Sequence, residues 1–116
     1  MNRPPVVAER ERTIFAMGGG GFTMEPSNPL LDDFVLSLAR RREPRVLFLP
    51  TASGDATAQV NAFRGRFGGR ACISEHLSLF HLRDLDRPLR EIVLAADIVY
   101  VGGGSMRNLL LSLIHI

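Results

Sequence analysis

Residues 96–110 of the sequence, ADIVYVGGGSMRNLL, join an apolar strand to a glycine turn. Such a turn presents bare backbone N–H groups at the carboxyl end of a strand, where α/β proteins build their sites. N–H groups held there can stabilise the oxyanion of a tetrahedral intermediate without help from a side chain. We therefore expect the backbone of Gly103 and Gly104 to form an oxyanion hole.

Ser105 follows the three glycines, and a serine on a strand-to-helix turn suggests the nucleophile elbow G-x-S-x-G. The match is incomplete because Arg107 stands where the elbow needs its closing glycine. A side chain there would crowd the turn. The pattern therefore argues against Ser105 as a nucleophile.

A second glycine run, residues 18–21, could in principle cradle a phosphate. It fits neither G-x-G-x-x-G, because Thr23 and Met24 occupy the sixth positions, nor the P-loop, because no Gly-Lys-Ser/Thr follows. We interpret it as a turn that needs close approach of the backbone.

The remaining polar candidates give no site by their spacing. His76 and His81 are five residues apart and lack the i, i+4 spacing of a helical metal pair. Asp32 and Asp33 stand at the start of a predicted helix, where carboxylates commonly complement the helix dipole. Cys72 is the only cysteine and is expected to be a small buried residue. The sequence predicts neither a metal site nor a cofactor.

Strands and helices alternate along the chain. Apolar runs predict four strands, at residues 13–17, 45–49, within 71–80, and 98–101. Helices are expected between them and after the last one, where Ser105 could cap. Alternation of this kind implies a parallel sheet covered on both faces, so we predict a three-layer α/β sandwich of the flavodoxin-like type.

Helical spacing also indicates which side chains should face the core. Asn28 and Asp55 are expected to cap the first two helices, with Pro29 in the first helical position. The predicted inward residues are Leu30, Leu31, Phe34, Val35 and Leu38; Ala56, Val60, Phe63 and Phe67; and Leu89, Ile92, Val93 and Ala96.

Composition narrows the class of protein. Of the 116 residues, 46% are hydrophobic and 22% charged, as in one ordinary globular domain or part of one. The net charge of +2 is too weak to indicate a nucleic-acid partner. Residues 1–12, MNRPPVVAERER, contain no apolar core of a secretory signal, and no apolar run reaches the roughly 20 residues that cross a bilayer. We expect a cytoplasmic protein with no membrane partner, whose oligomeric state the sequence does not indicate.

Three separated blocks, MGGGGFTMEPSNPLLDDFVLSLA, PRVLFLPTASGD and DIVYVGGGSMRNLL, resemble the N-terminal half of the peptidase E family of serine peptidases. This family is related to cyanophycinase and has a class I glutamine-amidotransferase-like α/β fold. The resemblance implies hydrolysis of short peptides, such as aspartyl dipeptides. It also implies a serine nucleophile in a G-x-S-A-G type motif and a histidine, both beyond the end of this chain.

The resemblance also assigns roles to residues that are present. Gly104 matches the glycine whose N–H helps form the family's oxyanion hole, while Ser105 stands where asparagine is usual. By topology, the loops near Gly20, Gly21, Thr51 and Ser53 would edge the substrate pocket. Ser105 is a further candidate for substrate binding.

We expect residues 1–12 to be an N-terminal extension and residues 13–110 to be the N-terminal half of a single peptidase domain. Residues 111–116, LSLIHI, depart from the family and back-translate to a transposon-based sequencing adapter. The chain is therefore expected to be a truncated gene product, inactive alone and poorly soluble, with a non-native tail in which His115 has no function.

Two alternatives remain open at this point. One is a cyanophycinase-like hydrolase, which would need the same missing serine. The other is a non-catalytic, flavodoxin-like module that binds a phosphate or nucleotide at its glycine loops. A G-x-S-A-G block followed by a histidine in the extended gene would favour a peptidase.

Overall fold

The computed structural model describes residues 12–17, 21–80 and 82–103. The α-helices are α1 (Gly21–Met24), α2 (Leu30–Leu38), α3 (Thr57–Phe67) and α4 (Leu89–Ala95), and the strands are β1 (Arg45–Leu49), β2 (Ile73–His76) and β3 (Ile98–Val101). Short 3₁₀ turns occupy Thr51–Ser53 and Leu82–Asp84. The strands form a parallel sheet in the order β2-β1-β3.

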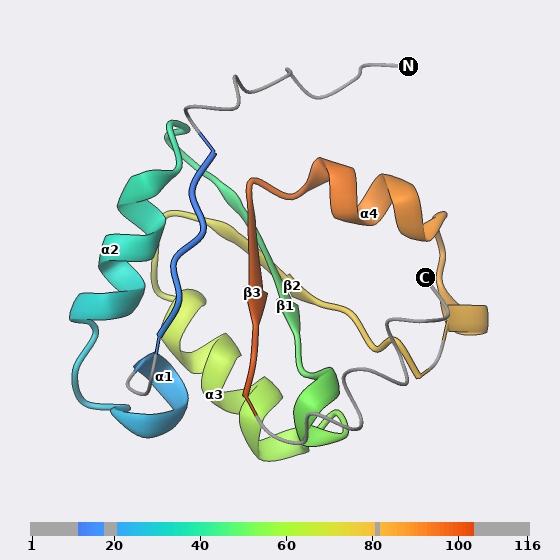
Figure 1. Cartoon of the computed structure of the whole chain (residues 1–116), viewed down its shortest axis with the longest axis horizontal. Helices are drawn as coiled ribbons and strands as arrows, with labels where there is room; N and C mark the ends of the chain where they lie inside the picture. Colours follow the sequence, from blue (N-terminus) through green and yellow to red (C-terminus); the bar gives the residue numbers. More distant parts are fainter. Residues whose placement is uncertain (1–11, 18–20, 81, 104–116) are drawn as a thin grey trace.

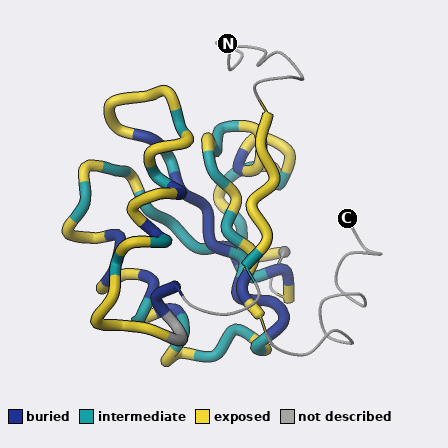
Figure 2. The backbone as a smooth tube through the Cα atoms, turned by 60° about the vertical axis from the view of Figure 1, so that its left-hand side comes forward, coloured by how far each residue is buried: buried dark blue, intermediate teal, exposed yellow. Residues whose placement is uncertain are grey.

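Helices cover the sheet on both faces, which gives the predicted three layers (Figure 1). The α/β fold expected from the sequence is thus confirmed. β1 lies in the centre because its run RVLFL is apolar on both faces, as buried parallel strands require. Figure 2 shows buried residues concentrated in the middle of the molecule and exposed ones around it.

The core on one face of the sheet is aromatic. Phe22 of α1 packs edge-on against Phe48 of β1, with ring centroids 5.3 Å apart. Phe63 of α3 stacks on Phe48 at 4.8 Å, and Phe67 completes the cluster. The helical spacing of Val60, Phe63 and Phe67 predicted this buried face correctly.

The opposite face is covered by α4. Leu47 of β1 packs there with Leu77, Leu79 and Ile92. Ile92 is buried as predicted, but Val93 is 37% exposed. It lies next to Ile92 in the helix, so its side chain points away from the sheet.

The predicted first strand is wrong. Residues 13–17 form no regular structure, and the described sheet has three strands rather than the predicted four. Ile14 is 98% exposed, so its side chain has no covering layer. A short apolar run becomes a strand only when a neighbour completes its ladder and buries its faces.

The predicted inward stripe of α2 is also wrong in part. Val35 is buried, but Leu30, Phe34 and Leu38 are exposed to 71%, 49% and 38%. The helix is rotated so that Asp32 faces the interior instead. The helix begins at Leu30, so Pro29 is at the N-cap rather than in the first helical position, and no side-chain cap is formed there. The Asn28 side chain, predicted to cap, accepts a hydrogen bond from the Leu30 N–H at 3.1 Å.

The predicted cap at Asp55 is not formed. No side-chain cap is present on α3, and Asp55 has a φ of +57°. The Ser53 hydroxyl accepts the Ala56 N–H instead, at 3.3 Å. The third predicted strand is shorter than its apolar run, and the predicted helix after Ser105 lies outside the described residues.

Candidate functional site

The carboxyl ends of the three strands meet at one edge of the sheet, and each carries a candidate segment. β1 ends in the turn around Thr51 and Ser53, β2 leads to Ser78, and β3 ends at Gly102 and Gly103. The Gly102 N–H donates to the Leu49 carbonyl at 3.1 Å, which extends the β1–β3 pairing into the glycine turn. The turn is therefore anchored on the sheet.

Gly102 and Gly103 differ in their surroundings. A Cβ on Gly102 would lie 2.9 Å from the Phe48 ring and 3.6 Å from Gln59 Oε1, so the backbone there passes directly over the core. A Cβ on Gly103 would meet no described atom within 4 Å. Gly102 is thus required for packing, whereas the exposed Gly103 leaves room for a ligand to approach its backbone.

The other predicted site residues differ in burial and in hydrogen bonding. Thr51 is fully buried, and its Oγ1 has no hydrogen-bond partner in the described part of the chain. The Ser53 hydroxyl donates to the Pro50 carbonyl at 2.8 Å, so it fastens its own loop. Gly21 is buried at the start of α1. Gly20, Gly104 and Ser105 lie outside the described residues.

Two residues at this edge were not predicted as site residues. Asp55 Oδ2 accepts a short hydrogen bond from the Ser78 hydroxyl, while its Oδ1 is buried without a partner in the described ranges. The same holds for Gln59 Oε1, beside Gly102. The signal in the sequence was a Gly-Asp turn after a buried strand, with a second polar side chain four residues later.

The left-handed backbone of Asp55 is uncommon outside glycine and costs on the order of 1 kcal/mol. Such strain persists where the surroundings enforce it, and here the bond to Ser78 does so. The result is a buried carboxylate oxygen held at the sheet edge. Thr51 Oγ1 and Gln59 Oε1 are likewise buried without a hydrogen-bond partner among the described residues.

No serine hydroxyl is hydrogen-bonded to a histidine ring among the described residues. The hydroxyls of Ser37, Ser53 and Ser78 donate to Phe34 O, Pro50 O and Asp55 respectively. His76 Nδ1 lies 3.4 Å from an Arg64 nitrogen. Burial, and then the charge of Arg64, lower the pKa of His76.

In the part of the chain that the structure describes, no three His, Cys, Asp or Glu side chains lie close enough together to hold a metal ion. Cys72 is half-buried, and its thiol donates to the Phe67 carbonyl at 3.3 Å. Burial raises the pKa of this thiol.

No described helix is long and apolar enough to span a membrane.

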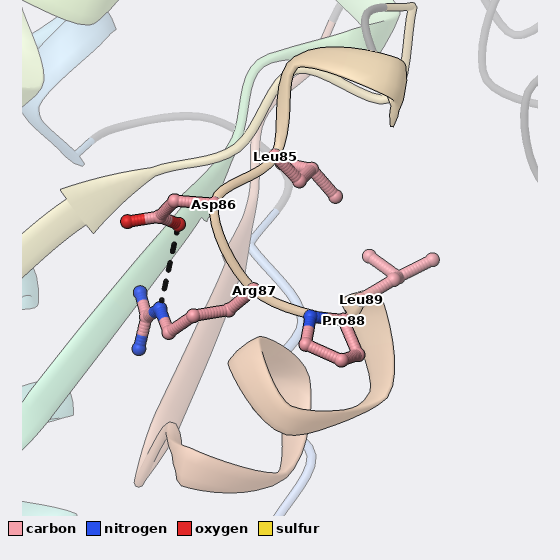
Figure 3. Close-up of a pocket in the computed structure, with 5 residues that line it drawn as sticks. All are labelled: Leu85, Asp86, Arg87, Pro88 and Leu89. Carbon is pink, nitrogen blue, oxygen red and sulfur yellow. Dashed lines mark ion pairs between the residues drawn. The ribbon is translucent and has the colours of Figure 1, made fainter.

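A separate open depression lies in the loop before α4, lined by residues 85–89 (Figure 3). Leu85 and Leu89 lie on one side of the loop, and on the other an ion pair joins Arg87 Nε to Asp86 at 3.6 Å. Arg87 also pairs with Glu75 at 3.0 Å. The depression contains none of the predicted site residues, and its charged groups satisfy one another.

The three-stranded parallel sheet with helices on both faces makes this an α/β protein, a class that binds ligands at the carboxyl edge of its sheet. The model of peptidase family S51 matches residues 14–115, and the chain belongs to that family. The matched range extends into the segment predicted to be a non-native tail.

An uncharacterized peptidase of Bacillus subtilis (strain 168), YgaJ, is 48% identical over 99 residues. The alignment covers 85% of this chain but 42% of that relative, so the chain spans about two-fifths of its length. No solved structure gave a significant match.

Proposed function

We propose that this chain is the N-terminal part of a serine-type peptidase that hydrolyses short peptides, such as aspartyl dipeptides. Membership of peptidase family S51 supports a peptidase, and the 42% coverage of the relative supports a longer protein. The single observation that carries the assignment of the site is the glycine turn at the end of β3, anchored on β1 and open at Gly103.

In this proposal residues of the 116-residue chain bind and polarise the substrate. The N–H groups of Gly103 and Gly104 donate to the carbonyl oxygen of the scissile bond and stabilise the negative charge that develops on it. The attacking serine and its histidine base lie beyond residue 116.

The turn that follows β1 and the glycine turn that follows β3 suit one reaction centre. The glycine N–H groups bind a carbonyl oxygen of the peptide. Both turns lie at the carboxyl edge of the sheet, on adjacent strands β1 and β3. The proposed location in the cytoplasm rests on the sequence alone.

The test compares the 116-residue chain with the protein encoded by the extended gene. We expect the extended protein to release aspartate from aspartyl dipeptides and the 116-residue chain to release none. Cleavage by the short chain would contradict a nucleophile beyond its end. An extended sequence without a G-x-S-A-G block and histidine, together with binding of inorganic phosphate, would favour the non-catalytic module, and hydrolysis of cyanophycin alone would favour the cyanophycinase-like hydrolase.

A backbone donor is tested by matched substitutions at Gly103 in the extended protein. Gly103→Ala keeps the N–H and enters open space, so kcat should change little. Gly103→Pro removes the donor, and losing one oxyanion donor typically lowers kcat by about 10²–10³-fold. Equal kcat values for the two variants, with both folded by circular dichroism, would remove Gly103 from the oxyanion hole.

A further inference from the structure

Three charged or polar side chains from different elements meet inside the molecule on the α1 side of the sheet. Asp32 of α2 is fully buried, and the side chain of Arg66 of α3 is 7% exposed. Arg66 Nε lies 3.0 Å from Asp32 Oδ2. The Tyr100 hydroxyl of β3 donates to Asp32 Oδ1 at 3.2 Å. We call these three residues the buried triad.

Arg66 also binds the segment that joins α1 to α2. Its Nη2 donates to the Glu25 carbonyl at 2.8 Å and to the Pro26 carbonyl at 3.0 Å. A guanidinium group holds several acceptors in a fixed planar arrangement. The ion pair with Asp32 therefore orients the guanidinium group that holds the backbone carbonyls of Glu25 and Pro26, just after α1.

Tyr100 contacts the beginning of α1. A Cβ on Gly21 would lie 2.6 Å from the Tyr100 hydroxyl and 3.4 Å from Asp32 Oδ1. The backbone at Gly21, with a φ of +73°, thus rests directly on the triad. Tyr100 itself is two positions before Gly102, so the same side chain belongs to the strand that ends in the glycine turn.

Stability alone does not account for such a group. Replacing a buried ion pair by apolar side chains is often neutral or stabilising, because both charges lose their hydration. What the triad provides that an apolar cluster would not is directional contact with two loops. A neighbouring pair joins Arg70, three residues after the end of α3, to Asp33 of α2 at 3.0 Å. Its side chains are 29% and 46% exposed, and exposed pairs of that kind contribute little.

We propose that Asp32, Arg66 and Tyr100 are positioning residues that hold the turn at Gly21 in a fixed place relative to the end of β3. The relevance to peptide binding, where these loops would face the substrate, rests on the proposed function. The mechanical coupling does not, and it can be measured on the 116-residue chain whether or not that chain belongs to an active peptidase.

The test is hydrogen exchange measured by mass spectrometry on Tyr100→Phe and Asp32→Asn, which keep the shape of each side chain. The reporting amides are Glu25, bonded to Gly21 O at 2.8 Å, Asn28, bonded to Glu25 O at 3.0 Å, and Gly102. We expect their exchange to accelerate about fivefold in Tyr100→Phe and on the order of 100-fold in Asp32→Asn. Exchange within β1 should change much less.

Asp33→Asn is the control, because it removes the exposed carboxylate next to Asp32 on the same helix. Its exchange pattern should match that of the unchanged chain. Equal acceleration of β1 and the reporting amides would make the triad a general stabilising element and overturn the proposal. Unchanged exchange at residues 21–28 in Tyr100→Phe, the milder of the two substitutions, would overturn it as well.

Discussion

Gly21 and Asp32 lie in surroundings that the sequence did not predict. Gly21 was predicted to edge a substrate pocket and is buried against the Tyr100 hydroxyl. Asp32 was predicted to complement a helix dipole and is instead paired with a cation inside the core. Both differences have one origin, because the buried triad occupies the space that α1 and α2 leave against β3.

Gly21→Ala should destabilise the chain by about 2 kcal/mol or more, because a positive φ and a close contact both oppose a side chain there. The double variant with Tyr100→Phe should recover part of that loss, since the hydroxyl that a Cβ would meet is gone, while the φ penalty remains. Urea denaturation of the single and double variants measures the coupling. Strict additivity would contradict the contact.

Tyr100 gives a direct optical probe, because it is the only tyrosine in a sequence without tryptophan. Burial, and then the charge of Asp32, raise the pKa of its phenol. Its folded-state pKa exceeds its unfolded one, so its contribution to stability is complete below about pH 10 and is lost as the pH rises further. Ultraviolet titration should show tyrosinate only above that pH.

Asp32→Asn removes a negative charge beside the phenol and should move the Tyr100 titration back toward its ordinary range. Circular dichroism recorded over the same pH series separates ionisation of the folded chain from unfolding. A phenol that ionises near pH 10 in the folded, unchanged chain would contradict its buried position.

At the scale of elements, α3 connects the core to the candidate site. Its buried face carries Val60 together with Phe63 and Phe67 of the aromatic cluster, while its first turn brings Gln59 beside Gly102. The position of Gln59 therefore depends on the packing of α3 against β1. The same helix thus supplies three buried side chains of the core and one polar side chain at the carboxyl edge of the sheet.

Phe63→Ala should cost about 3–5 kcal/mol, because it removes a fully buried ring that stacks on Phe48. A core this small gives the chain a low free energy of unfolding, so we expect Phe63→Ala to lose the folded circular dichroism signal at moderate temperature. Phe34→Ala, at a ring that is 49% exposed, is the matched control and should shift the melting midpoint only slightly.

At the scale of the whole molecule, one face of the sheet is incompletely covered. Val99 and Val101 pair in register with Leu47 and Leu49, so all four side chains lie on the same face. Leu47 is 1% exposed beneath α4, whereas Val99 and Val101 are 43% and 51% exposed. The cover that protects β1 does not extend over β3.

Exposed apolar strands at a sheet edge promote association, so we expect the isolated chain to aggregate at rising concentration. Val99→Thr with Val101→Thr should reduce this association, measured by analytical ultracentrifugation, because threonine keeps the preference for a strand. Ile73→Thr, on the opposite edge strand and 40% exposed, should have less effect. A monodisperse, cooperatively melting monomer of the unchanged chain would contradict the prediction.

The sequence by itself determined that strands and helices alternate from β1 to β3, that β1 is covered on both faces, and which face of α3 is buried. These depend on local periodicity, which reports how many faces of an element are covered. The glycine turn after β3 could be predicted for the same reason, since a strand followed by glycines is a local pattern. Membership of the peptidase family also followed from such local blocks.

Only the tertiary structure decided the fate of residues 13–17, the rotation of α2 and the positions of Asp55 and Gln59. Each depends on partners distant in the chain: Asp32 and Tyr100 are 68 positions apart, and Asp55 meets Ser78 across 23. A buried charge is tolerated only where an opposite charge and hydrogen-bond partners surround it. Those partners come from distant parts of the chain, so the periodicity of the local sequence does not indicate them.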